Sequence, residues 1–539
     1  MHGLATVRGV IRGKGTADGL MEMLAVSGLN CDLFRSARAP SVNVAVDTVC
    51  DLSNLTAVEA VRRIANGDMR AEEYAMRLLE RHRALKSLNA ITWIDETRVL
   101  EAARAVDQRR RGGDSLGLLG GLPVVIKDNI DIAGTPTAGA CASFRHNIRP
   151  LHAPVAQRLF DQGAVFFARA NMHELAGGGT SSNPFTGAVR NPYDPQRVAG
   201  GSSGGTAAAI AARIVPAGLG SDTAGSVRIP SALCGTAGLR PSIFGGKLYS
   251  DQGMLPLASE LDTVGPMGRT VADVALLHAA ITGKPTPAVP DLRGVRIGVP
   301  RSPYWEEIDS EVSRVAENAL VRLRAAGATL INMDAGSYYS LASEVYGTLV
   351  MYGIKEDLRQ YLRQIGSRMR VEDVIESIAS KDTKSLFERA QNMAFTPEQL
   401  AEARNVRRRQ IDAAYRDLFQ SNELTAIVFP TQPMAAPPIN VDGDTAMDEI
   451  EINGKKVSEV LIFIRNTHVT CALGTPGLSV PAGLTAEGLP VGLELDGLAG
   501  QDSELLALGM AVEQAWPQLP GPQGLGLRGL AVGVNQVPA

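Results

Sequence analysis

The sequence predicts an α/β protein in which helices cover a parallel sheet. The segment 292–334 holds an apolar run, LRGVRIGVPR, then an amphipathic helical pattern that ends at Gly327, then a second apolar run, ATLINMD. A strand, a helix and a strand in this order form a β-α-β unit, whose two strands are parallel. The runs LPVVIK at 122–127 and AVFFARAN at 164–171 predict two more buried strands.

The remaining elements are predicted along the chain from periodicity and capping patterns. Thr56 and Glu59 have the spacing of a capping box, and they open a helix that Gly67 can end. Charged helical patterns follow at about 70–84 and at 96–111. Further along, the sequence predicts a helix from about Ala153, a mostly helical segment at 336–420, strands at 425–433 and 478–483, and a last helix at 500–516.

Composition narrows the class of function. The 539 residues include 53 basic and 57 acidic ones, and 45% are hydrophobic, so the chain is globular and has no electrostatic reason to bind nucleic acid. No apolar run approaches the roughly 18 residues of a membrane span. Five cysteines, odd in number and far apart, indicate neither a disulfide framework nor a zinc site. We therefore expect a cytoplasmic protein that acts on a small molecule, without a metal, a cofactor, a nucleic acid or a membrane as partner.

The most informative stretch is rich in glycine and spans 200–235. Two serine sites, Ser202/Ser203 and Ser226, lie in glycine-rich turns, and the run Ala207 to Ala212 between them predicts a buried helix. Glycine lets backbone N–H groups converge on a small anion. Ser226 is the better candidate for such a turn, because Pro230 just after it is tolerated near a helix start.

Three motifs together resemble the amidase signature family of serine amidohydrolases. They are GLPVVIKDNIDIAGTPTAGA at 121–140, GGSSGG at 200–205 and GSDTAGSVRIPSALCG at 220–235. The resemblance covers most of 52–515 and is weakest between about 336 and 420. It implies one large mixed, mostly parallel twisted sheet flanked by helices.

The resemblance also implies a Ser-Ser-Lys triad. Carried over by position, Ser226 is the nucleophile, Ser202 the bridging serine and Lys127 the base. A lysine base must be neutral, and burial lowers the pKa of an ammonium group. An ion pair with Asp128 or Asp131 is the ordinary alternative for Lys127. The family's bridging serine follows a cis peptide, which corresponds here to Gly201–Ser202.

The mechanism that the resemblance implies passes through an acyl-enzyme. Its oxyanion is held by backbone N–H groups, those of Thr223, Ala224, Gly225 and Ser226. Within the family the chain is most similar to indoleacetamide and mandelamide hydrolases, which implies an aryl or arylalkyl amide split into an acid and ammonia or an amine. Because an aromatic wall suits such a substrate, we predict that Tyr346 and Tyr352 bind it.

Other functions stay open at this point. One is the amidase subunit of a glutamine-dependent tRNA amidotransferase; others are a carbamate, ester or anilide hydrolase and a binding protein without catalysis. Ser203 lies in a G-x-S-x-G pattern typical of a nucleophile elbow, but no strand precedes it. His173-Glu174 lacks the spacing of a metal site, so His173 is predicted to be structural.

The predicted organisation has three parts. Residues 51–516 form the amidase domain, in which 336–420 is the helical segment on the substrate side. Residues 517–539 form a tail rich in proline and glycine. Residues 1–50 lie outside the resemblance and are predicted to be a mobile extension. An arm that joins two copies into a homodimer is the alternative for them.

Overall fold

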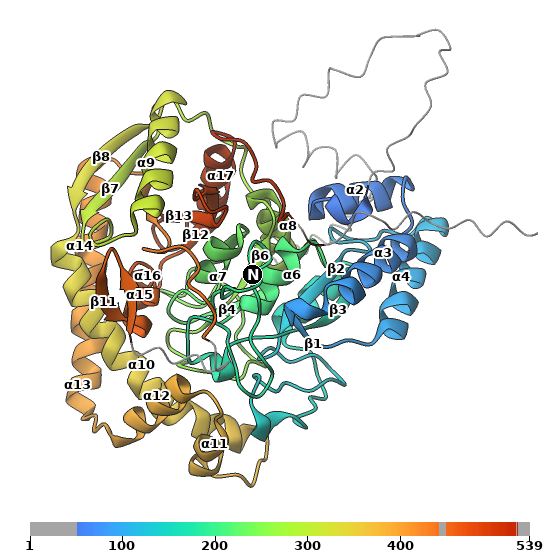
Figure 1. The fold of residues 1–539 in the computed structure, drawn as a ribbon, viewed down its shortest axis with the longest axis horizontal. Coiled ribbons are helices and arrows are strands. Elements are labelled where there is room, and N and C mark those ends of the chain that lie inside the picture. Colours follow the sequence, from blue (N-terminus) through green and yellow to red (C-terminus); the bar gives the residue numbers. More distant parts are fainter. Residues whose placement is uncertain (1–50, 441–448, 524, 526–539) are drawn as a thin grey trace, which may run out of the picture.

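A computed structural model describes residues 51–440, 449–523 and 525. The predicted extension 1–50 lies outside the described residues, and so does the predicted tail from 526 onward. One large sheet with helices packed around it dominates the described part of the chain (Figure 1). Its strands are β1 (Ile91–Trp93), β2 (Pro123–Lys127), β3 (Val165–Ala170), β4 (Ala217–Asp222), β5 (Ala237–Arg240), β6 (Thr263–Gly268), β7 (Arg296–Ser302), β8 (Thr329–Asp334), β9 (Ala426–Pro430), β12 (Gly477–Leu484) and β13 (Pro490–Asp496).

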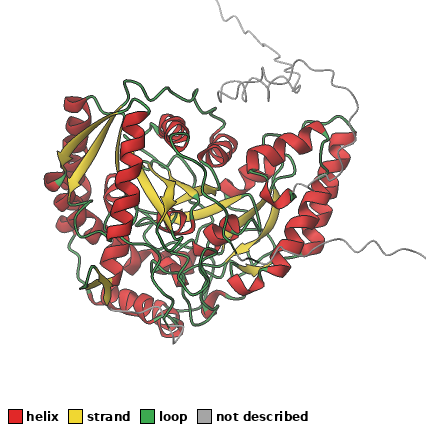
Figure 2. Ribbon diagram, turned by 45° about the horizontal axis from the view of Figure 1, so that its top comes forward, coloured by secondary structure: helices red, strands yellow, loops and turns green. Residues whose placement is uncertain are grey.

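A small hairpin, β10 (Glu449–Ile452) and β11 (Lys455–Ser458), lies apart from the large sheet. Helices surround the sheet in the view of Figure 2. They are α2 (Ala57–Asn66), α3 (Ala71–Ala84), α4 (Glu96–Arg111), α5 (Pro154–Asp161), α6 (Gly204–Ala211), α7 (Arg228–Cys234), α8 (Val271–Thr282), α9 (Ser310–Ala325), α10 (Gly336–Gln364), α11 (Val371–Ser377), α12 (Lys381–Asn392), α13 (Pro397–Ala401), α14 (Arg408–Asn422), α15 (Glu459–Ile464), α16 (His468–Leu473) and α17 (Asp502–Glu513).

The sheet is mixed, as expected, and its strand order is β1-β3-β2-β4-β6-β5-β12-β13-β9-β7-β8. Parallel pairing joins β3 to β2, β2 to β4, β9 to β7 and β7 to β8. The other six pairings within the described sheet are antiparallel. The α/β class and the large mixed sheet flanked by helices are confirmed, but antiparallel pairs exceed the share that the sequence predicts.

The difference comes from short strands with low β-propensity in the middle of the sheet. The runs AGLGSD in β4, AGLR in β5 and TVGPMG in β6 are rich in glycine, alanine and proline, and periodicity gives no sign of them. Packing explains part of this composition: a Cβ at Gly218 would lie 2.6 Å from the Val125 side chain, and one at Gly220 would lie 2.7 Å from Ser203 Oγ. Glycine is needed where α6 and β2 approach β4 so closely.

The three helices predicted before the LPVVIK strand are confirmed as α2, α3 and α4. Thr56 and Glu59 form both hydrogen bonds of the capping box that opens α2, and Gly67 ends the helix with a φ of 81°. Among the described residues, no helix has both the length and the apolar character needed to cross a membrane.

The segment 336–420 is helical, as predicted, and forms one side of the molecule. Its helices α10 to α14 lie on the opposite side from α2 to α4 in Figure 1, where they are coloured yellow to orange. Their buried side chains form a hydrophobic cluster with residues next to the glycine-rich loops, among them Met172, Leu175 and Leu257. This packing places the helical segment against the loops that carry the predicted triad.

Candidate active site

Lys127 is the last residue of β2, whose five residues are all buried. Its Nζ lies 2.7 Å from Ser202 Oγ and 2.9 Å from Ser221 Oγ. The two aspartates that were its alternative partners are engaged elsewhere: Asp128 pairs with Arg169 and Asp131 with Arg149, both at 3.2 Å. Lys127 therefore faces hydroxyl groups at contact distance, as a base requires.

Burial sets the protonation state of Lys127. The side chain is fully buried, and this desolvation lowers its pKa to about 7, although the carboxylates of Asp222 and Asp262 act in the opposite direction. A large fraction of Lys127 is therefore neutral near neutral pH.

Ser202 joins Lys127 from the loop before α6. The peptide Gly201–Ser202 is cis, as the resemblance implied, and Ser202 is fully buried. The carbonyl of Ser202 accepts a hydrogen bond from the N–H of His173 at 3.1 Å. The neighbouring Ser203 is also fully buried, and its Oγ donates to the Ser221 carbonyl at 3.2 Å. Ser203 thus braces α6 against β4, which disagrees with the interpretation as a nucleophile elbow.

Ser226 lies in the loop between β4 and α7, next to this pair. Its carbonyl accepts a hydrogen bond from the Ser203 N–H at 3.2 Å, which ties the loop to the residue after Ser202. Ser226 is 6% exposed, whereas Lys127 and Ser202 are at 0%. Of the three predicted triad residues, Ser226 is the one that lines the cavity of about 760 Å³ beside this loop.

The Asp222 carboxylate shapes this loop. It accepts the N–H groups of Gly225 at 2.9 Å and Val227 at 3.2 Å, and it pairs with Arg228 and Arg240. Burial raises the pKa of Asp222, but the two guanidinium groups hold it well below its usual range. Because the Gly225 N–H donates its hydrogen bond to Asp222, it is not available to hold an oxyanion, contrary to its predicted role. Thr223, Ala224 and Ser226 stay the predicted oxyanion donors.

A cavity of about 760 Å³ opens beside Ser226. Aromatic rings of Tyr339, Tyr346 and His468 form part of its wall. Aliphatic side chains form much of the rest, namely Ile229, Leu257, Val350, Met351, Leu386, Met393, Leu461 and Ile464. The volume and the lining of this cavity are typical of a binding site for a small, largely apolar molecule.

A family model described as Amidase matches residues 73–506. The chain belongs to the amidase family. Indoleacetamide hydrolase of Agrobacterium vitis is 37% identical over 463 residues, which cover 85% of this chain and 96% of the relative. Mandelamide hydrolase of Pseudomonas putida is 31% identical over 493 residues, 88% of this chain and 94% of the relative.

The name of another relative specifies a different activity. A glutamyl-tRNA(Gln) amidotransferase subunit of Thermosynechococcus vestitus is 32% identical over 488 residues, 85% of this chain and 97% of the relative. Among solved structures, a crystal structure of an amidase superposes with a TM-score of 0.75 at 31% identity, over 86% of this chain and all of the other. The amidase-family fold is therefore shown by sequence and structure alike.

The two tyrosines predicted to bind substrate have different surroundings. Tyr346 lines the cavity of this amidase-family chain, and its ring centroid lies 5.5 Å from that of His468. Tyr352 is absent from the lining; its ring packs against Phe395 at 5.7 Å, with the Arg404 guanidinium 5.0 Å from its centroid. The cavity therefore gives no support to Tyr352 as a substrate-binding residue, and that assignment stays a prediction. Six residues along a helix amount to about 600° of rotation, which points Tyr352 to another face of α10 than Tyr346.

The sequence missed other parts of the site. Gly177 to Gly179 line the cavity from the loop after β3, and His468 lines it from α16. His468 Nδ1 lies 3.1 Å from the Ile464 carbonyl, which can only accept, so Nδ1 carries the proton and Nε2 faces Ser343 Oγ at 2.7 Å as an acceptor. Burial lowers the pKa of His468 to about 4 and keeps the ring neutral. The run of three glycines is visible in the sequence, but no local motif marks His468, which chain folding alone brings to the cavity.

Ser221 was also missed, although its sequence position offered a clue. It precedes Asp222 inside the motif GSDTAGS, and its Oγ lies 2.9 Å from Lys127 Nζ and 3.0 Å from Asn129 Nδ2. Ser221 thus helps to orient the lysine.

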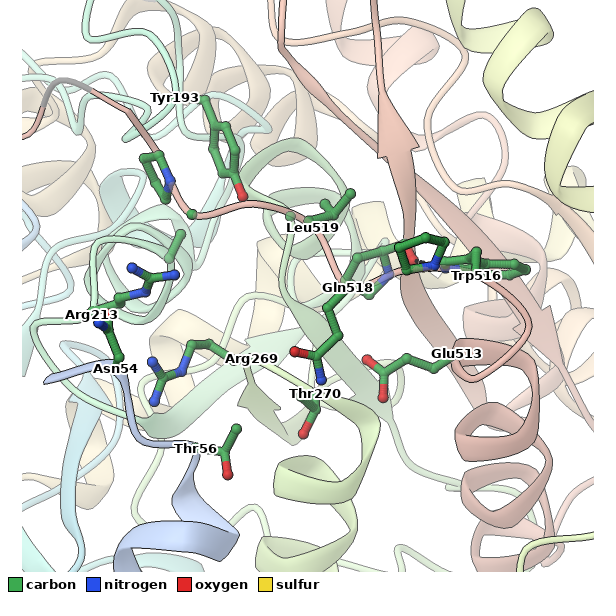
Figure 3. A pocket seen from close by; sticks show the side chains of 16 residues that line it. Asn54, Thr56, Tyr193, Arg213, Arg269, Thr270, Glu513, Trp516, Gln518 and Leu519 are labelled. Carbon is green, nitrogen blue, oxygen red and sulfur yellow. Dashed lines mark hydrogen bonds between the residues drawn. The ribbon is translucent and has the colours of Figure 1, made fainter. Parts of the chain in front are cut away.

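A second cavity, of about 110 Å³, lies between the start of α2 and the end of α17 (Figure 3). Arg213, Arg269 and Glu513 line it, and Tyr193 and Gln518 border it from other elements. It shares no lining residue with the larger cavity and holds none of the predicted site residues.

Proposed function

We propose that this chain hydrolyses a small arylalkyl carboxylic amide to the acid and ammonia, through an acyl-enzyme on Ser226. The observation that carries the proposal is the 2.7 Å contact between Lys127 Nζ and Ser202 Oγ beside a large, mainly apolar cavity that Ser226 lines. A base, a relay hydroxyl and an accessible hydroxyl are the groups that amide cleavage by a serine needs.

The first half of the reaction forms the acyl-enzyme. Ser226 Oγ attacks the amide carbonyl carbon while its proton passes to Ser202 Oγ, and the Ser202 proton passes to neutral Lys127 Nζ. The oxyanion that forms accepts hydrogen bonds from the backbone N–H groups of Thr223, Ala224 and Ser226. One such donor is worth about 3–4 kcal/mol in other enzymes. Lys127 then returns the proton through Ser202 to the leaving nitrogen, the C–N bond breaks, and ammonia departs.

The second half repeats the proton path with water. Water attacks the acyl carbon, its proton moves through Ser202 to Lys127, and the proton returns to Ser226 Oγ as the ester bond breaks. The carboxylic acid leaves, and the site regains its starting protonation. Lys127 acts in both halves as a neutral base, so its lowered pKa is part of the mechanism.

The size and lining of the cavity favour a substrate whose acyl part carries an aryl group. Tyr339, Tyr346 and His468 offer aromatic faces, and the volume of about 760 Å³ greatly exceeds what an acetyl group needs. The relatives whose names specify arylalkyl amides, indoleacetamide and mandelamide hydrolases, support the same substrate class.

A second candidate is the amidase subunit of a glutamine-dependent tRNA amidotransferase. The 32% identity to an amidotransferase component over 488 residues favours it. The aliphatic and aromatic lining argues against it, because the side chain of glutamine is short and polar.

Hydrolysis by the purified chain tests the proposal. The panel contains indole-3-acetamide, phenylacetamide, acetamide, glutamine, and a matched ester, carbamate and anilide. We expect the highest kcat/KM on the arylacetamides without any added protein. Turnover of glutamine above the arylacetamides would favour the amidotransferase function, and ester or carbamate turnover above all amides would overturn the assignment of the scissile bond.

A further inference from the structure

A buried pair, His173 and Asp382, connects the catalytic loops to the helical segment. His173 follows β3 and is fully buried; its Nε2 lies 3.1 Å from Oδ2 of Asp382 in the first turn of α12. The Asp382 side chain is only 9% exposed. The pair therefore joins two elements that lie far apart in the sequence.

The hydrogen bonds of the ring fix its orientation. The Ser181 N–H lies 3.2 Å from His173 Nδ1, and an N–H can only donate. Nδ1 is thus the acceptor, and the ring proton sits on Nε2, which faces the Asp382 carboxylate. With a hydrogen bond at Nδ1 and the Asp382 carboxylate 3.1 Å from Nε2, the ring has little freedom to rotate.

Two hydrogen bonds connect His173 and its partner Ser181 to Ser202, the predicted bridging serine. The backbone N–H of His173 donates to the Ser202 carbonyl at 3.1 Å, and Ser181 Oγ donates to the same carbonyl at 3.3 Å. Ser181 Oγ also accepts the Gly204 N–H at 3.1 Å, at the start of α6. Asp382 is consequently linked to Ser202 through one ring and two short hydrogen-bonded connections.

The same pair lies under the loop that lines the cavity. A Cβ at Gly178 would come within 2.3 Å of the His173 ring and 2.9 Å of Asp382 Oδ2, so the loop packs directly on both residues. Glu174 adds a second connection, because its Oε2 accepts the N–H groups of Ala379 at 3.0 Å and Ser380 at 2.8 Å, just before α12. Four α12-side residues then line the cavity: Leu386, Arg389, Asn392 and Met393.

We propose that His173 and Asp382 are positioning residues, which hold the α12 wall of the cavity in register with Ser202. They touch neither substrate nor reacting atoms; they fix the distance between the wall that contacts an aryl group and the loop that carries the proton relay. The inference rests on the proposed function for its kinetic consequence. An arylacetamide contacts the α12 wall and depends on the pair, whereas acetamide, with a methyl group only, does not.

Three variants test this on the purified full chain. Asp382→Ala removes the carboxylate, Asp382→Asn keeps an oxygen that accepts from Nε2, and Ser385→Ala changes an exposed residue of the same helix. For Asp382→Ala we expect kcat/KM on phenylacetamide to fall about 10-fold more than on acetamide. Asp382→Asn should stay within about threefold of the wild type on both, since the acceptor is retained. Ser385→Ala should match the wild type.

Equal losses on both amides in Asp382→Ala, or a loss in Asp382→Asn as large as in Asp382→Ala, would overturn the proposal. Hydrogen–deuterium exchange supplies a readout that needs no turnover. Faster exchange in 381–393 and 177–179 of Asp382→Ala, with wild-type exchange in Asp382→Asn, supports the positioning role. Unchanged exchange in Asp382→Ala overturns it. A wild-type chain that hydrolyses none of the amides would refute the proposed function and still leave this test decisive.

Discussion

Lys127 Nζ lies 2.7 Å from Ser202 Oγ, and both side chains are fully buried. The nearby aspartates Asp128 and Asp131 bind arginines, so the lysine has hydroxyl oxygens as its close neighbours. A buried ammonium without a carboxylate in contact is costly, and its neutral form is favoured. This relationship determines what mutation and pH should do to the enzyme.

Replacement of Ser226 by alanine should abolish amide hydrolysis and leave the fold intact. The side chain supplies the attacking oxygen in the proposed mechanism and is partly open to the cavity, so little packing is lost. We expect kcat to fall by about 10⁴-fold or more on the best arylacetamide of the panel. Ser231→Ala is the matched control, because Ser231 lies buried in the adjacent α7 and its Oγ has no partner among the described residues. Wild-type turnover by Ser226→Ala would refute the nucleophile.

Lys127→Ala should lose nearly as much activity as Ser226→Ala, and Ser202→Ala should lose less. Lys127 is the proposed final acceptor of the proton, whereas Ser202 only relays it, and water can replace a relay hydroxyl in part. Steady-state kinetics with the same amide give the comparison. If Ser202→Ala were as active as the wild type, the 2.7 Å contact would have no part in proton transfer.

The rate should rise with pH through a single ionisation near 7. Burial lowers the Lys127 pKa to about 7, and the base acts only after it loses its proton, so kcat/KM should be low at pH 5.5 and level above about pH 8. His468, whose pKa is lowered to about 4, does not titrate in this range. A neutral amide substrate is needed for the measurement. A profile that falls as pH rises from 6 to 8 would contradict the role of Lys127.

The same lowered pKa predicts a pH-dependent cost in stability. Between pH 7 and the ordinary lysine value of 10.5, the unfolded chain binds a proton at Lys127 that the folded chain does not. The folded state therefore gains stability as pH rises across this window. Going from pH 9 to pH 7, the wild type should lose about 2 kcal/mol more of its free energy of unfolding than Lys127→Met, which cannot titrate. Urea unfolding at both pH values measures this; identical pH dependence of the two proteins would show that Lys127 keeps an ordinary pKa.

The sequence predicts the strands near the two edges of the large sheet better than the central strands β4, β5 and β6. The apolar runs of β2, β3, β7 and β8 and the capping box of α2 are visible locally, because periodicity and caps depend on neighbouring residues. The central strands β4, β5 and β6 consist of small residues chosen for close packing between elements, so their sequence carries no strand pattern. The antiparallel centre of the sheet was missed for that reason.

The site divides in the same way. Lys127, Ser202 and Ser226 were predicted from the family resemblance that three short motifs carry, and the structure brings the segments that hold them together. The wall of the cavity depends on which face of α10 points inward and on helices α15 and α16 far along the chain. Helix rotation cannot be read from the presence of tyrosines alone, so the sequence does not distinguish Tyr346, which lines the cavity, from Tyr352, which does not.

Substrate preference should respond to Tyr346 and not to Tyr352. Both tyrosines lie on α10, so they form a matched pair. Tyr346 lines the cavity in ring contact with His468, and Tyr339 lines it two turns earlier on the same face of α10. Tyr352 does not line this cavity, and its ring packs on Phe395. Removal of an aromatic wall takes contact from an aryl group and leaves acetamide nearly unaffected.

For Tyr346→Ala we expect the ratio of kcat/KM between phenylacetamide and acetamide to fall about 10-fold, which corresponds to an apolar contact of about 1–3 kcal/mol. Tyr352→Ala should keep the wild-type ratio, even if the melting temperature falls because the ring no longer packs on Phe395. Tyr346→Phe should behave like the wild type, since it retains the ring. A parallel fall on both amides in Tyr346→Ala would show that Tyr346 supports the fold and does not select the substrate. A change of the ratio in Tyr352→Ala would support Tyr352 as a substrate-binding residue.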